Sequence, residues 1–267
     1  MTSTHPAPVE PAHRQRRTAR TVVALMLREM ATSYGRSPGG YLWAVAEPVA
    51  ALALLSLVFS LAFAAPPLGT NFPLFYATGY LPFMLFNDVA NRVATSIRFS
   101  KPLFAYPGVG YLDAILARFT LAVLTHLAVG ALVLGGILTI FITHATPEPG
   151  PIVAALGLAA ALALGIGTLN CYLMTAFPVW ERAWQIATRP LFLISGIFFV
   201  YDGLPRAAQE ILWFNPLMHI VGLMRQGFYG YYDGAYISPL YVGTVSIATL
   251  VTGFMLLYRH HRRLMED

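Results

Sequence analysis

Residues 119–142 have the sequence FTLAVLTHLAVGALVLGGILTIFI, which contains no Asp, Glu, Lys or Arg. A helix rises about 1.5 Å per residue, so these roughly 24 residues reach about 36 Å, more than the ~30 Å hydrocarbon core of a bilayer. Soluble proteins seldom contain so long an uncharged run. The segment therefore predicts an all-α integral membrane protein.

The composition of the whole chain supports this prediction. Of its 267 residues, 57% are hydrophobic and 11% are charged, whereas soluble domains carry about 25% charged residues. Lys and Arg number 17 against 12 Asp and Glu, and these cations lie between apolar runs instead of along one polar face. That distribution indicates membrane orientation and argues against nucleic-acid binding. With Cys171 as the only cysteine, an intramolecular disulfide is excluded.

Further apolar runs occur on both sides of this segment. The fifth is the weakest, because only Pro190 to Tyr201 lie between Arg189 and Asp202. We expect six transmembrane helices, at residues 41–64, 72–94, 114–142, 151–177, 184–202 and 239–258.

Positive charge predicts the orientation. Fifteen of the 17 Lys and Arg residues lie before the first span, around the second and fourth connections or after the last span. Because cytoplasmic loops retain such residues, we expect both termini in the cytoplasm. Residues 1–17 predict a disordered basic tail, 18–36 an amphipathic helix on the membrane surface, and 37–267 the transmembrane domain. The alternative for residues 18–36 is a cytoplasmic helix packed on the bundle.

The segment after the fifth span is apolar but interrupted. Ile211 to Phe214 and Leu217 to Met224 are separated by Asn-Pro, a pattern that favours a re-entrant pair of short helices between spans five and six. An ordinary interfacial loop is the alternative. The Gly/Tyr-rich string at residues 227–236 carries no pattern to which we assign a role.

Three charged residues lie within the first two expected spans. Glu47 precedes Pro48 inside the first span, where a carboxylate needs a partner or water, and Arg36 is the nearest candidate. Asp88 and Arg92 are four residues apart, which predicts a local ion pair on one helix face.

The chain carries no nucleotide-hydrolysis motif. Lys101 is the only lysine, and its flanking Ser100 and Pro102 do not fit the P-loop pattern G-x-x-x-x-G-K-[ST]. No metalloprotease, serine-hydrolase or Cys/His zinc pattern is present either. We expect no enzyme active site, no metal site and no cofactor bound by this chain.

The second cytoplasmic connection has an unusual composition. Residues 99–113, FSKPLFAYPGVGYLD, mix a cation, prolines, glycines and four aromatic residues. This mixture suits a short element that docks into a partner's groove, and equally suits an interfacial loop with its aromatics among lipid headgroups. Aromatic residues are also frequent in the last third of the chain, where they indicate a membrane-interface belt or a channel wall on which sugar rings stack.

Three strings carry a family resemblance: LREMATSYGRSPGGYLWAVAEP (27–48), LFAYPGVGYLDAILAR (103–118) and NPLMHIVGLMR (215–225). They resemble the opening signature, the cytoplasmic connection and the outer segment of polysaccharide-export permeases of the ABC-2 type, in particular capsular polysaccharide permeases. The resemblance covers nearly the whole chain after the tail.

The resemblance implies an inner-membrane homodimer that exports a lipid-linked capsular polysaccharide. Two copies of a separate ATPase subunit would bind ATP and Mg²⁺, and periplasmic and outer-membrane export proteins would be further partners. The alternatives are an O-antigen or teichoic-acid exporter and, more distantly, a membrane-embedded glycan-modifying enzyme using Glu47 and Asp88.

The resemblance also implies roles for individual residues. Those expected to couple to the ATPase are Arg28, Glu29, Phe99, Leu103, Phe104, Tyr106, Pro107 and Asp113. Those expected along the substrate path are Tyr41, Trp43, Glu47, Phe192, Phe198, Phe199 and Tyr201. Those expected in an outer gate are Trp213, Phe214, Asn215, Pro216 and His219.

Overall fold

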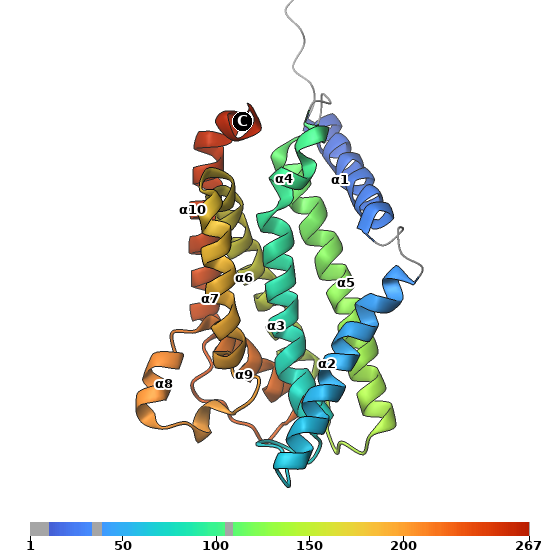
Figure 1. Cartoon of the computed structure of the whole chain (residues 1–267), viewed down its shortest axis with the longest axis vertical. Helices are drawn as coiled ribbons and strands as arrows, with labels where there is room; N and C mark the ends of the chain where they lie inside the picture. The colour runs from blue at the N-terminus through green and yellow to red at the C-terminus, as the bar shows by residue number, and fades with distance from the viewer. Residues whose placement is uncertain (1–10, 34–38, 105–108, 267) are drawn as a thin grey trace, which may run out of the picture.

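The computed structural model describes residues 11–33, 39–104 and 109–266, whose regular secondary structure is entirely helical (Figure 1). The α-helices are α1 (Pro11–Ser33), α2 (Gly40–Ala62), α3 (Phe72–Ala94), α4 (Ser96–Ser100), α5 (Tyr111–Ile140), α6 (Pro149–Ala176), α7 (Pro178–Ile194), α8 (Arg206–Leu212), α9 (Pro216–Phe228) and α10 (Pro239–Glu266). Two 3-10 helices, η1 (Lys101–Leu103) and η2 (Tyr201–Gly203), complete the described elements.

Within the described residues, four helices are long and apolar enough to cross a membrane: Leu42–Ala62, Tyr111–Ile140, Pro149–Ala176 and Pro239–His260. An all-helical membrane protein is thereby confirmed. Helices α3 and α7 occupy the places of the other two expected spans.

Those two helices differ in how well they match the expected bounds. Helix α3 coincides with residues 72–94. Helix α7 lies toward the N-terminal side of residues 184–202: it starts with Pro178 in its first turn and stops at Ile194. Gly196 follows with φ +80°, a left-handed conformation that suits glycine and turns the chain out of the helix.

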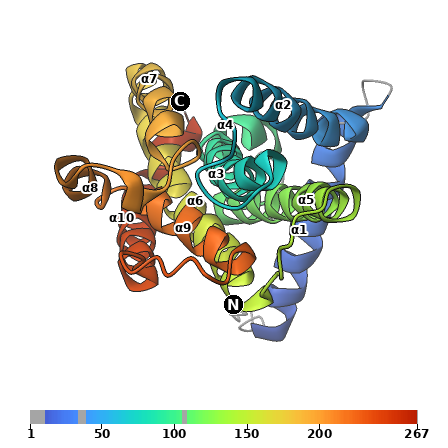
Figure 2. The same ribbon diagram turned by 90° about the horizontal axis from the view of Figure 1, so that it is seen from below.

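The core of the bundle forms around α3 (Figure 2), which packs against α2, α5, α6 and α9. Helices α6 and α10 approach one another closely, and glycines permit it. A Cβ added to Gly165 would collide with the Ser246 carbonyl and the Thr249 hydroxyl, and one on Gly253 would lie 2.6 Å from the Leu169 nitrogen. Small residues let membrane helices approach closely, so this seam depends on glycine.

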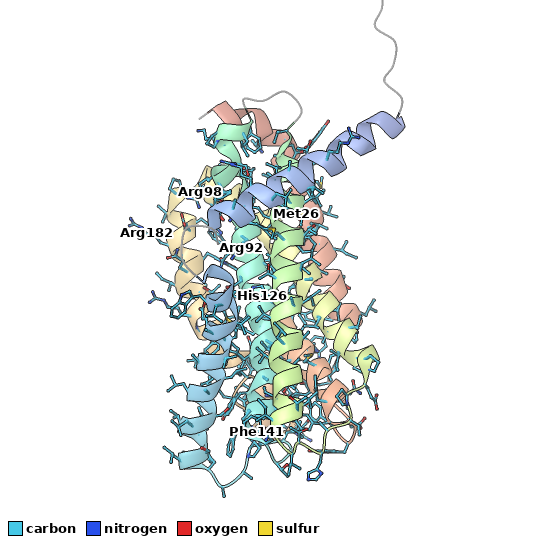
Figure 3. All side chains as sticks on the ribbon, turned by 90° about the vertical axis from the view of Figure 1, so that its right-hand side faces the viewer. Met26, Arg92, Arg98, His126, Phe141 and Arg182 are labelled. Atoms are coloured by element: carbon cyan, nitrogen blue, oxygen red, sulfur yellow. The ribbon has the colours of Figure 1, made fainter. Side chains whose placement is uncertain are left out.

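Helix α1 differs from the expected helix at residues 18–36. It begins at Pro11, so residues 11–17 are helical instead of belonging to a disordered tail, and residues 34–36 lie outside the described part of the chain. Figure 3 shows α1 lying across one end of the bundle. Glu29 is buried while Val23 and Leu27 are exposed, so the helix packs on the bundle and also presents apolar side chains outward.

Helix α2 is peripheral. Among its described side chains only Leu52 and Ser56 are buried, and Figure 2 shows α2 and α7 on the same side of α3. This side of the molecule is therefore bordered by two loosely packed helices.

Candidate functional site

A buried ionic cluster joins α1 to the bundle at the end where residues 99–113, the expected coupling segment, lie. The Arg118 Nε donates to the Glu29 Oε1 at 3.1 Å, and the Arg92 Nη1 lies 3.6 Å from the same oxygen. The Arg118 Nη1 also donates to the Thr95 hydroxyl at 3.0 Å. Because the Glu29 side chain is 3% exposed and that of Arg118 is 10% exposed, both ions depend on these contacts.

The coupling segment rests on this cluster. The Phe99 ring lies under the Arg118 guanidinium, 4.4 Å from its carbon to the ring centroid, and remains 41% exposed. Leu103 and Phe104 are half-buried, and Phe104 packs against the core. The structure thus brings Glu29, Phe99 and Phe104 into one region, whereas the Arg28 side chain is exposed.

The remaining residues of the expected coupling set are placed differently. Tyr106 and Pro107 lie outside the described residues. Asp113 is nearly buried, and its Oδ2 accepts the Gly110 N–H at 3.0 Å. Its position therefore caps the start of α5, where a carboxylate satisfies an otherwise unpaired backbone donor.

An ion pair links α4, directly before the coupling segment, to α7. The Arg98 Nη1 of α4 donates to the Glu181 Oε2 in the first turn of α7 at 2.8 Å, with both side chains more than a third exposed. Sequence reasoning missed this contact because the two residues are 83 positions apart.

Aromatic side chains form a cluster between α2, α3 and the end of α7. The Phe192 ring lies 5.4 Å from that of Phe83 and 5.2 Å from that of Phe198, while Phe198 approaches Phe59 at 5.7 Å. Phe192 and Phe198 are half-buried. Both belong to the expected substrate path, and the structure brings them together on the side bordered by α2 and α7.

Other residues of the expected path lie elsewhere. Trp43 is 67% exposed at the start of α2, and the Tyr41 side chain lies outside the described part. Tyr201 is buried at the opposite end, where its ring stacks on Tyr236 at 3.9 Å. The role of Tyr236 in the packing was not apparent from the sequence.

The residues expected to form an outer gate lie together in the turn between α8 and α9 and in the first turn of α9. The Asn215 Oδ1 accepts the Leu217 N–H and caps α9, while its Nδ2 donates to the Ile194 carbonyl at 3.1 Å and to the Ser195 hydroxyl at 3.3 Å. Pro216 is the first residue of α9, and Phe214 is exposed. The expected break between two short helices is therefore present, with Asn215 fastening it to the end of α7.

His219 of α9 hydrogen-bonds to the same turn. Its Nδ1 accepts the Ser238 N–H at 3.2 Å, so its Nε2 carries the proton and donates to the Trp213 carbonyl at 2.7 Å. Burial lowers the pKa of His219 below its usual 6.5, against the opposing effect of its backbone hydrogen bonds. A neutral imidazole therefore holds the Trp213 backbone against α9 through this hydrogen bond.

Arg225 is the largest fully buried side chain among the described residues. Its Nη1 donates to the Phe199 carbonyl at 2.7 Å and its Nη2 to the Ile197 carbonyl at 3.2 Å, with the guanidinium 4.2 Å above the Phe75 ring. Sequence reasoning did not single out Arg225, because nothing in the local pattern distinguishes a buried arginine from an interfacial one. Its contacts bind α9 to the chain that follows α7.

Polar residues of α2, α3 and α5 surround a cavity of about 400 Å³ that includes Glu47. The Asp88 Oδ2 lies 3.2 Å from the His126 Nε2, and Arg92 approaches Glu29. The expected Asp88–Arg92 pair was therefore wrong in its partners, since helices α5 and α1 supply the groups that Asp88 and Arg92 contact. Arg36, the expected partner of Glu47, lies outside the described residues.

No group of three or more metal-binding side chains occurs in the described part of the chain. The arrangement instead consists of helices joined by buried ions, caps and aromatic packing. Such contacts can transmit movement and line a passage.

Comparison with known proteins identifies the family of this chain. The sequence model of the ABC-2 type transporter family matches residues 20–229. The chain is 32% identical over 248 residues to the polysialic acid transport protein KpsM of Escherichia coli, covering 92% of this chain and 95% of the relative. It is 27% identical over 234 residues to the capsule polysaccharide export inner-membrane protein CtrC of Neisseria meningitidis serogroup B, covering 88% of each chain. It is 29% identical over 238 residues to the capsule polysaccharide export inner-membrane protein BexB of Haemophilus influenzae, covering 89% of each.

The family is one of membrane permeases that lack an ATPase domain and work with an ATPase subunit, in agreement with the missing P-loop. On the extent of both the family match and the relatives' coverage, this chain belongs to the ABC-2 type transporter family.

Proposed function

We propose that this chain is the inner-membrane permease of an ATP-driven exporter of capsular polysaccharide. It works as a homodimer with two ATPase subunits, spans the membrane six times with both termini in the cytoplasm, and passes a lipid-linked glycan toward periplasmic and outer-membrane proteins. The full-length similarity to permeases named for polysialic acid transport and capsule export supports this substrate class. ATP and Mg²⁺ belong to the ATPase.

One observation carries the mechanism: α7 has contacts at both ends and no buried residue between them. At its first turn, Glu181 pairs with Arg98 of α4, directly before the coupling segment. At its last turn, the Ile194 carbonyl accepts a hydrogen bond from Asn215 at the start of α9. A helix held at its ends and loosely packed along its length can move as a rod.

The ATPase stroke would enter through α4 and η1. Glu29 and Arg118 tie the same region to α1 and α5, so α1 and the coupling segment move together. Displacement of α4 then pulls or releases α7 through Arg98, and α7 moves α9 through Asn215. This route joins the cytoplasmic ATPase to the outer gate residues Trp213, Phe214, Asn215, Pro216 and His219 within one subunit.

The substrate path lies on the side bordered by α2 and α7. Helix α2 buries little within its own subunit, and its exposed Leu57 and Leu61 suit contact with a second copy. Phe192 and Phe198 stand on the same side, where aromatic rings can stack on the C–H faces of sugars as the chain slides.

The first experiment tests assembly. The chain is co-expressed with the candidate ATPase in the producing cell, and Lys101→Cys is crosslinked to cysteines engineered around the ATPase's groove. Lys101 is exposed within η1, and the buried native Cys171 contributes no background. We expect a crosslink between permease and ATPase, whereas Ile142→Cys, which is 82% exposed beyond the far end of α5, gives none.

The second experiment tests transmission. Arg98→Gln breaks the pair with Glu181, and we expect ATP hydrolysis to continue while capsule export falls by at least fivefold. The matched control is Arg182→Gln, which removes the neighbouring exposed cation of α7. Equal export by the Arg98→Gln variant and the wild type would refute the α7 route, and a missing Lys101 crosslink would refute the assembly itself.

A further inference from the structure

A groove runs between α2 and α5 and changes from polar to apolar along its length. Its polar part is the cavity of about 400 Å³, lined among others by Trp43, Glu47, Asp88, Arg92 and His126. Its apolar part is a second cavity of about 270 Å³, lined among others by Val49, Leu52, Val133, Gly136 and Ile140. Volumes of this size are typical of pockets that hold small molecules.

The two parts follow one another along α5. Val129 lines the polar cavity, and Leu132 and Val133, about one turn later, line the apolar one. On α2, Glu47 and Pro48 line the polar cavity, whereas Val45 and Val49 line the apolar one. The groove therefore has the form that an amphiphile requires, with a charged end followed by an apolar channel.

The charged end lies at the cytoplasmic side of the bundle. Figure 3 shows Arg92 near α1, His126 about halfway along the bundle, and Phe141 toward the end opposite α1. His126 and Ile140 are 14 residues apart on α5, or about 21 Å at 1.5 Å per residue, which exceeds the ~15 Å depth of one leaflet's hydrocarbon. The apolar channel therefore reaches as far as an acyl chain of the inner leaflet.

The charges select the headgroup. Glu47 has no ion pair among the described residues, and Asp88 has only His126, which is charged when protonated. Arg92, which also lies 3.6 Å from the Glu29 carboxylate and is 30% exposed on its side chain, supplies a cation beside them. Two carboxylates and a guanidinium match a headgroup that has both an ammonium and a phosphate, because a purely anionic headgroup would leave the carboxylates uncompensated at membrane depth.

We propose that the groove between α2 and α5 holds one phosphatidylethanolamine molecule of the inner leaflet. Its ammonium lies between Glu47 and Asp88, its phosphate faces Arg92, and one acyl chain follows α5 past Gly136. The residues that line the groove belong to α2, α3 and α5, whereas Figure 2 shows α7 on the other side of α3 from α5. The site takes Trp43 and Glu47 out of the expected substrate path and is separate from the aromatic cluster around Phe192 and Phe198. The lipid is a constituent of the bilayer instead of the cargo's anchor.

The acyl part is tested by filling the channel. A Cβ at Gly136 meets no atom within 4 Å, and the same holds for its neighbour Gly135, which does not line the groove. Gly136→Leu and Gly135→Leu therefore add the same side chain to the same helix at two positions where a Cβ has room. The full-length wild type and both variants are reconstituted in nanodiscs of equal phosphatidylethanolamine and phosphatidylglycerol, extracted in mild detergent, and analysed by native mass spectrometry.

We expect the wild type and Gly135→Leu to retain about one phosphatidylethanolamine per chain, with at least threefold preference over phosphatidylglycerol. Gly136→Leu should lose at least fivefold of that lipid while unfolding at the same temperature as Gly135→Leu. Glu47→Gln should bring the headgroup preference close to one. Retention in the bulk ratio by the wild type, or equal retention by the two leucine variants, overturns the proposal.

A third readout addresses occupation of the groove by a second copy of the chain. Leu132 lines the groove and is 64% exposed, so Leu132→Cys reports what covers it. With lipid in the groove, this cysteine should react with a membrane-soluble maleimide and form no disulfide-linked dimer. Rapid formation of the linked dimer would show that a second subunit fills the groove and would overturn the lipid assignment.

Discussion

Replacing Glu29 with glutamine tests whether the buried ionic cluster docks α1 on the bundle. The substitution keeps the shape of the side chain and an acceptor oxygen but removes its charge, so Arg118 stays buried without this counter-ion and keeps Thr95 and the Phe99 ring as partners. Breaking a fully buried pair on one side costs about 3–5 kcal/mol. Because Arg118 keeps a hydrogen bond and a ring contact, we expect about 2–4 kcal/mol here.

This cost acts on the equilibrium between docked and undocked α1. At 1.4 kcal/mol per factor of ten, the undocked population rises roughly 30- to 700-fold. Hydrogen exchange measures this directly, because amides of a helix that opens locally exchange in proportion to the open population. The assay is hydrogen–deuterium exchange with mass spectrometry on the full chain in nanodiscs, followed over peptides from residues 20–33.

Glu181→Gln is the matched control, since it removes one carboxylate from an arginine pair that is more than a third exposed on both sides. Exposed pairs contribute about 0.2–1 kcal/mol, so exchange in α1 should be unchanged and exchange in α7 should rise less than about fivefold. Exchange in α1 of the Glu29→Gln variant that stays within threefold of the wild type would refute the docking role of the cluster.

Three further substitutions test the helix contacts by thermal unfolding in detergent. Gly165→Ala should lower the unfolding temperature, because overpacking the seam between α6 and α10 costs about 1–3 kcal/mol. The control Gly157→Ala, whose Cβ would meet open space, should leave the unfolding temperature unchanged or raise it. Equal changes in unfolding temperature for the two variants would contradict the close-approach argument. Arg225→Met removes the donors to two carbonyls at about 1–3 kcal/mol each and should lower the unfolding temperature by at least about 4 °C, and an unchanged temperature would show that these bonds contribute nothing. The folded-state pKa of His219 is depressed, so its contribution to stability is complete above pH ~6.5 and is lost as the pH falls below that value. His219→Gln should therefore lose less stability between pH 7.5 and 5 than the wild type. Parallel curves of unfolding temperature against pH for the two proteins would exclude His219 as a source of the acid sensitivity.

The sequence predicts the helices that are uniform along their length and predicts poorly those that are not. Helices α5, α6 and α10 follow from uncharged runs, because membrane insertion depends on length and apolarity. Helix α7 was displaced in the expectation because Glu181 and Arg182 interrupt its first turns, and only the structure shows that Glu181 is held by Arg98.

Some functional contacts could likewise be predicted from the local sequence, and others could not. Asn215 was recognisable from its local context, since Asn before Pro is a typical helix start. Glu29 could be placed near the coupling segment only by resemblance, and its buried contact with Arg118 bridges 89 positions. For Asp88, spacing suggested a partner on its own helix, and a histidine on another helix proved closer. Tertiary packing decides such pairs, and no local pattern encodes it.

The sparse packing of α2 has a consequence for biosynthesis. A helix that buries only Leu52 and Ser56 among its described side chains gains little from neighbours that are synthesised after it. It must partition from the translocon into lipid on its own hydrophobicity, before α3 and α5 exist to receive it. Polar substitutions on α2 should therefore reduce the amount of protein that enters the membrane, whereas equally polar changes in the buried α3 should act later, on the assembly of helices already inserted.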